Sequence, residues 1–115
     1  MTETLGSVRS AGAQCYRLAH EALTGWEEAW AEYVTAKGLL TRKYAESFDG
    51  YRSLNMAVGQ CEVKADADCW PYEEVMLLAE GKWRIAKAAY ELNKAGMNMA
   101  QSNMASIKAE MELAR

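Results

Sequence analysis

The chain has one histidine, His20, and this is the side chain best suited to act as a general base near neutral pH. Nucleophilic catalysis would also need a nucleophile beside the imidazole and an acid to orient it. Cys15 is the nearest thiol, but a spacing of five residues does not bring two side chains together on a helix. We therefore expect His20 to be a surface or interface residue, and we expect the protein not to be an enzyme.

Two groups of residues resemble metal ligands in type but not in spacing. Asp66 and Asp68 form an Asp-x-Asp pair, but a calcium loop continues with a third ligand, a glycine and a bidentate glutamate, and these are missing here. Thioethers such as those of Met97 and Met104 suit copper(I), but in a helix these two residues would lie two turns, or about 10.5 Å, apart. We therefore predict no metal site and no cofactor.

The three cysteines are Cys15, Cys61 and Cys69. Cys61 and Cys69 enclose a polar stretch that could be the loop of a helical hairpin, so a disulfide across the neck of that loop is one interpretation. The alternative, which we favour, is two half-buried thiols in a reducing compartment, because the amino terminus lacks the basic start and apolar run of a secretion signal.

Composition limits the class of protein. Ala, Glu, Leu, Met and Lys dominate, and the 115 residues include one proline, which predicts a single all-α domain. The net charge of −3 and the lack of a basic run argue against nucleic-acid binding and against an anionic membrane surface. No stretch has the roughly 18 apolar residues of a membrane span. The expected location is the cytoplasm.

The stretch 70–114 predicts one long helix with two apolar seams. With Met76 at heptad position a, the a positions are mostly large and the d positions mostly alanine, which is typical of a coiled-coil seam with close helix approach. A second seam, about 110° away on the helix, runs through the c positions. Its apolar members include Leu78, Ile85, Leu92 and Met99.

The first arm, about 5–61, follows the same pattern. With Trp26 at position a, large residues again occupy a and small ones occupy d. A second apolar stripe includes Leu23 and Trp30. Asp49-Gly50 is a turn dipeptide, so this arm is either continuous or broken near Gly50. Residues 62–69 are small and charged and predict the connecting loop, followed by the second arm at about 70–114.

The predicted fold is therefore a long antiparallel helical hairpin that associates into a helical bundle. A lone hairpin would leave both second seams bare, so we expect self-association into a dimer or a higher oligomer. Asn93, at a d position among apolar residues, is the candidate device for fixing the register of that bundle.

Three functions are compatible with these patterns. The one we favour is a non-enzymatic interaction module that contacts another protein as an adaptor, inhibitor or assembly component. An alternative is an oligomer that binds a small, nucleotide-like ligand between subunits, with aromatic rings to stack on a base and Arg17, Arg52 or Arg84 to meet phosphate. The third is a structural component of a larger particle, built by head-to-tail association.

Overall fold

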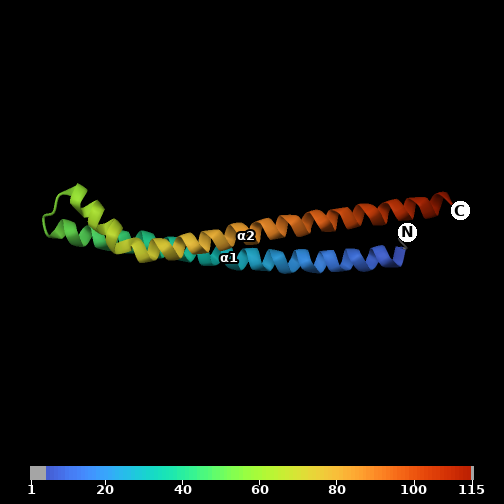
Figure 1. Ribbon diagram of the computed structural model, residues 1–115, viewed down its shortest axis with the longest axis horizontal. Helices are drawn as coiled ribbons and strands as arrows, with labels where there is room; N and C mark the ends of the chain where they lie inside the picture. The colour runs from blue at the N-terminus through green and yellow to red at the C-terminus, as the bar shows by residue number, and fades with distance from the viewer. Residues whose placement is uncertain (1–4, 115) are drawn as a thin grey trace. The chain divides into compact units, whose positions relative to one another are not determined.

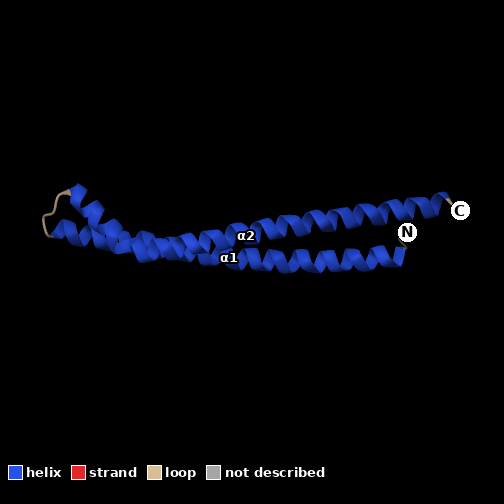
Figure 2. Cartoon of the chain, viewed as in Figure 1, coloured by secondary structure: helices blue, strands red, loops and turns tan. Residues whose placement is uncertain are grey.

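The computed structural model describes residues 5–114, without the side chains of Leu5 and Val8. It contains two helices, α1 (Leu5–Ser53) and α2 (Val58–Leu113), and no strand within the described residues. The helices run alongside each other in opposite directions (Figure 1) and are joined by one short loop (Figure 2). The predicted all-α antiparallel hairpin is therefore confirmed, and α1 continues unbroken through Gly50.

The contacts between the helices divide the chain into two compact units. We call the first the terminal unit; it comprises Met1–Trp26 and Ile85–Arg115. The second, the turn unit, is the continuous stretch Glu27–Arg84. Each unit therefore contains one segment of α1 and one segment of α2.

The hairpin turns at residues 54–57, not at 62–69, so the predicted loop was wrong. Asn55 has a left-handed backbone (φ 64°), and its N–H donates to the carbonyl of Arg52. The N–H of Met56 reaches back to the carbonyl of Tyr51. This bond pattern is the Schellman motif, which ends a helix with one residue in the left-handed region, usually Gly and sometimes Asn.

Residues 62–69 are helical because their small residues form a buried stripe. Cys61, Ala65 and Cys69 recur every fourth residue, so they lie on one face of α2, and each is 3% exposed or less. The charged residues between them are exposed, so this polar stretch forms a helix and not a loop. Pro71 then lies inside α2, not in its first turn, and the start of the helix is inclined to the part of α2 that follows it in the turn unit (Figure 1). A proline inside a helix removes one backbone hydrogen bond and promotes such a bend.

In both units the helices meet along the seam of a and d positions that the sequence predicts, here called the inner seam. Alanines are among its most enclosed residues, with Ala79 at 3% and Ala19 at 6% exposure. Its large residues are half-buried and stack across the helix pair. Trp26 stacks on Tyr90 in the terminal unit (5.2 Å between ring centroids), and Tyr33 stacks on Trp83 in the turn unit (5.7 Å).

The close approach of the helices at Ala79 can be tested by enlarging that residue. We expect Ala79→Leu to force the helices apart and to lower the free energy of unfolding by about 1 to 3 kcal/mol, because there is no room for the added carbons. Ala31→Leu, at an exposed position on α1, is the control and should change it by less than about 0.5 kcal/mol. Urea unfolding followed by circular dichroism measures both. An equal effect of the two variants would contradict close packing at Ala79.

Candidate functional site

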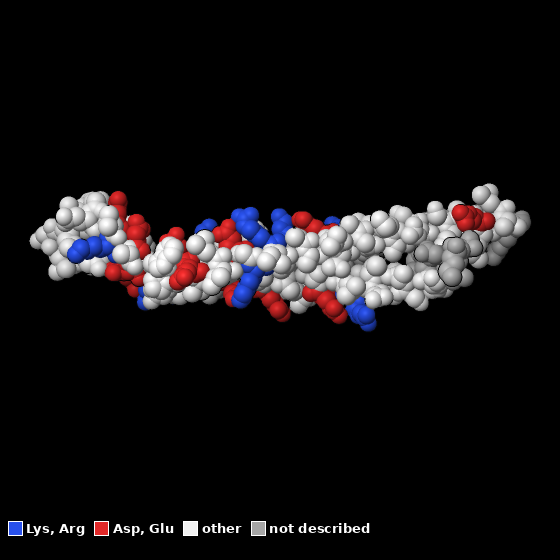
Figure 3. Space-filling model, viewed as in Figure 1, with Lys and Arg blue, Asp and Glu red and all other residues white. Residues whose placement is uncertain are grey.

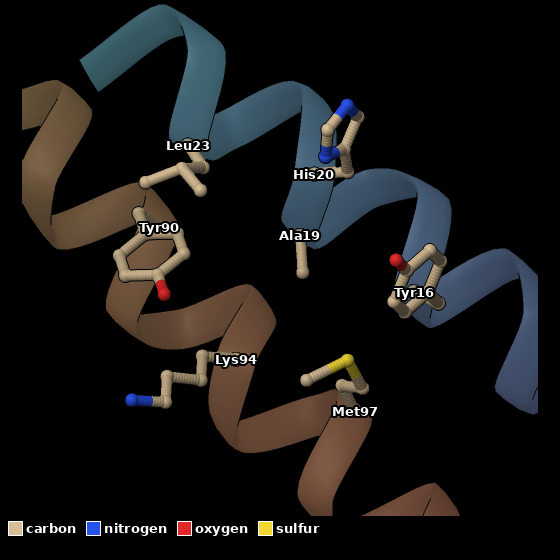
Figure 4. Close-up of a pocket in the computed structure, with 7 residues that line it drawn as sticks. All are labelled: Tyr16, Ala19, His20, Leu23, Tyr90, Lys94 and Met97. Atoms are coloured by element: carbon tan, nitrogen blue, oxygen red, sulfur yellow. The ribbon is translucent and has the colours of Figure 1, made fainter. Parts of the chain in front are cut away.

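A hollow of the terminal unit lies between the helices around His20 (Figure 4). Its volume is about 170 Å³. The residues that line it are Tyr16, Ala19, His20, Leu23, Tyr90, Lys94 and Met97. In Figure 4 the imidazole of His20 points away from α2, and the ammonium group of Lys94 points away from the α1 residues. These polar groups do not converge on one point, so the hollow has no acid–base arrangement around His20.

Cys61 and Cys69 are free thiols on the same helix. Eight residues of helix rise by about 12 Å, whereas the Cα atoms of a disulfide lie within about 7 Å, so the disulfide suggested by the predicted loop cannot form within the chain. The Cys61 thiol donates to the carbonyl of Met56 (3.6 Å), and burial, followed by the charges of Asp68 and Asp66, raises the pKa of the Cys69 thiol. A protonated, enclosed thiol is a poor nucleophile. Cys15, also free, is half-buried on α1.

A hydrogen-bonded cluster around Asp68 links the two helices of the turn unit. The carboxylate of Asp68 accepts hydrogen bonds from the hydroxyl groups of Tyr51 and Ser47 (2.8 Å for Ser47), and Lys64 lies over the Tyr51 ring at 5.5 Å. The Tyr51 and Ser47 hydrogen bonds, aided by the charge of Lys64, hold the pKa of Asp68 below its usual range. The same bond raises the pKa of Tyr51. Sequence reasoning missed this cluster because its members pair only once the turn is placed at residues 54–57.

The arginines suggested for phosphate binding do not form a common site. Arg84 is bound to Glu80 one turn away (2.7 Å), and Arg52 donates to the carbonyl of Met56 (2.6 Å). Arg17 is exposed on α1 in the terminal unit. Within residues 5–114 there is also no cluster of three or more His, Cys, Asp or Glu side chains that could hold a metal ion.

The second seam of α2, here called the α2 outer seam, is exposed to solvent. Leu78 lies in the turn unit, and Ile85, Leu92 and Met99 lie in the terminal unit. Their side chains are 68 to 75% exposed. The neighbouring position Gly96 would have open space around an added Cβ. Four large apolar side chains at heptad spacing therefore lie on the surface of one helix.

The second stripe of α1, here called the α1 outer seam, is also largely uncovered. Its members are Tyr16 and Leu23 in the terminal unit and Trp30 and Val34 in the turn unit. Tyr16 is 64% exposed, whereas Leu23 is half-buried. Trp30 packs its ring against Trp83 (4.9 Å between centroids) and still remains 45% exposed.

One stretch of each helix in the terminal unit lacks charged residues. The stretch 95–107 of α2 and the stretch 10–16 of α1 contain no Lys, Arg, Asp or Glu. Figure 3 shows much of this part of the terminal unit in white on the face drawn. Asn93 is half-buried in the same unit, and its amide donates to the carbonyl of Ala89 on its own helix (2.8 Å). Its role in fixing a register between copies remains a prediction.

No protein-family model, no curated protein and no solved structure matches this chain. Among the described residues, no helix is long and apolar enough to cross a membrane. The outer seams are thus the surface features that stand out most clearly from an ordinary helical hairpin.

The Asp68 cluster predicts a pH dependence of stability. Its hydrogen bonds favour the charged carboxylate, so the unfolded chain takes up a proton at higher pH than the folded chain. The stabilisation is therefore fully present above the unfolded pKa of about 3.9 and is lost as the pH falls through the folded pKa. We expect the difference in Tm between the wild type and Asp68→Asn to shrink when the pH is lowered from about 6 to about 3. Tyr51→Phe, which keeps the carboxylate but removes a donor, should weaken this pH dependence. A Tm difference independent of pH would contradict the role of the charge.

Proposed function

We propose that this protein is a non-enzymatic interaction module that self-associates through its outer seams and offers the remaining surface of the oligomer to another protein. The observation that supports the proposal is the exposure of large apolar side chains at heptad spacing on both helices. Apolar patches of this kind mark interaction sites, because monomers rarely leave them in contact with water.

The total accessible surface of the chain is also large for its mass. The chain exposes 8399 Å² at a mass of 12.8 kDa. A compact monomer of that mass exposes about 6,300 Å². The excess of about 2,000 Å² is larger than the roughly 800 Å² that each partner buries in a standard interface. The hairpin thus has enough surplus surface for at least one full interface.

The energetics favour a partner with a comparable apolar surface. Covering four large apolar side chains stabilises a complex by about 6 to 12 kcal/mol. Association costs roughly 4 to 15 kcal/mol in lost freedom of motion. One seam packed against a polar surface would therefore give at best a weak complex. If the seam packs against another apolar seam, the free energy gained by burying apolar side chains roughly doubles. A second copy of the chain carries such a seam.

The molar mass in solution tests self-association directly. We expect light scattering over a dilution series, with a reductant present to keep the three cysteines as thiols, to show an oligomer that dissociates on dilution. Leu92→Lys should raise the dissociation constant at least tenfold, because it places an unpaired charge in the seam. Gln14→Lys, which adds the same charge at an exposed polar position, is the control. A wild type that stays monomeric at every concentration would disprove the proposal.

A further inference from the structure

In the terminal unit, the two outer seams lie on opposite flanks of the helix pair. Tyr16 and Leu23 line the same hollow as Lys94, so the α1 outer seam shares its flank with Lys94 (Figure 4). Leu92 precedes Lys94 by two residues, which places the two side chains about 160° apart around α2. Ile85 lies one heptad before Leu92 and Met99 lies one heptad after it, so both are on the same side of α2 as Leu92. The α2 outer seam therefore faces away from the α1 outer seam.

The turn unit shows the same arrangement by an independent contact. Lys82 pairs with Glu32 of α1 at 3.5 Å, and this ion pair marks one flank. Leu78 lies one turn before Lys82 and shares its side of α2. On α1, Trp30 precedes Glu32 by two residues and so lies about 160° away from it. In this unit, too, the apolar stripe of α1 and that of α2 occupy opposite flanks.

The two seams are also level along the helices. In the terminal unit the contact between Trp26 and Tyr90 sets the register. Leu23 lies three residues before Trp26, and Leu92 lies two residues after Tyr90, so in this antiparallel pair they differ by one residue, or about 1.5 Å of rise. Tyr16 lies seven residues before Leu23 and Met99 lies seven residues after Leu92, so these two are level to within one residue as well.

We infer that the α1 outer seam of one copy packs against the α2 outer seam of a second copy, in an antiparallel contact between two different surfaces. The inference rests on the proposed self-association and specifies how it occurs. A second copy in the same orientation, without axial displacement, brings Leu23 opposite Leu92 and Tyr16 opposite Met99. The contact continues the alternation of antiparallel helices that already exists inside each hairpin.

Side-chain size and charge agree with this pairing. The aromatic ring of Tyr16 would meet a part of α2 where Gly96 leaves open space. In the turn unit, the stack of Tyr33 on Trp83 places Arg42 of α1 level with Glu74 of α2. Both side chains are exposed, so the same displacement brings the cation of one copy close to the carboxylate of the next. Pairing the α1 seam with itself would not bring these opposite charges together.

A contact between two different surfaces leaves one seam free at each end of a dimer. Further copies can therefore add until the assembly closes into a ring or grows as an open array. This differs from a symmetric dimer, in which one surface pairs with itself and is used up. The proposed pairing thus predicts assembly beyond the dimer at high concentration.

Two variants, each with one damaged seam, test the pairing. Tyr16→Lys/Val34→Lys alters the α1 outer seam, and Ile85→Lys/Leu92→Lys alters the α2 outer seam. Tyr16, Val34, Ile85 and Leu92 are all exposed, and circular dichroism checks that helix content is kept. Light scattering should show each variant as a monomer at concentrations where the wild type associates. An equimolar mixture should form a 1:1 dimer that grows no further, because one intact α1 seam and one intact α2 seam remain.

Other outcomes separate the inference from the proposed function. If either variant alone still dimerises, the intact seam pairs with itself; the inference is then wrong and self-association stands. If both variants are monomers and the mixture stays monomeric, the pairing is likewise wrong. If the wild type itself is a monomer, both the inference and the proposed function fail.

Discussion

The close contact of the two helices at the inner-seam alanines is the constraint on which the rest of the structure depends. Ala79 and Ala19 are almost fully enclosed, so the helix backbones approach closely along that line. Large residues cannot occupy those positions, and the rings of Trp26, Tyr33 and Trp83 fill the space beside them. Because a two-helix pair encloses only one narrow line of side chains, the remaining large apolar residues have no place inside a single hairpin.

The inner seam could be read from the sequence because its period is long and regular. Large residues at a and alanines at d repeat over several heptads in each helix, and the structure places them between the helices. The turn could not be read in the same way. Its only local signal is Asn55 without a glycine or proline, whereas Cys61, Ala65 and Cys69 form a buried stripe of small residues that resembles a loop in composition. The charged residues between these three favour a turn, but burial of the three small residues at every fourth position stabilises a helix instead.

Because the turn was predicted at residues 62–69, the interactions expected near it were wrong as well. Once residues 62–69 are helical, Cys61 and Cys69 become successive members of one buried stripe and cannot face each other. The same change moves Asp68 from the predicted loop into a helix, where it accepts hydrogen bonds from Tyr51 and Ser47. The members of that cluster lie on both sides of the turn, so the cluster can be predicted only when the turn is placed correctly. By contrast, the exposed positions of the α2 outer seam followed directly from helix geometry.

The opposed flanks of the outer seams explain why a symmetric dimer would be an incomplete solution for this chain. In the terminal unit, a two-fold contact through Ile85 and Leu92 would cover the α2 outer seam and leave Tyr16 and Leu23 on the far flank in water. Contact between unlike seams uses both surfaces in every interior copy, so the apolar area covered per chain rises with the size of the assembly. Its two end seams remain bare, and a foreign helix with a matching apolar stripe could occupy one of them. Self-assembly and capture of another protein would then compete for the same surface, which links the size of the oligomer to the amount of partner present.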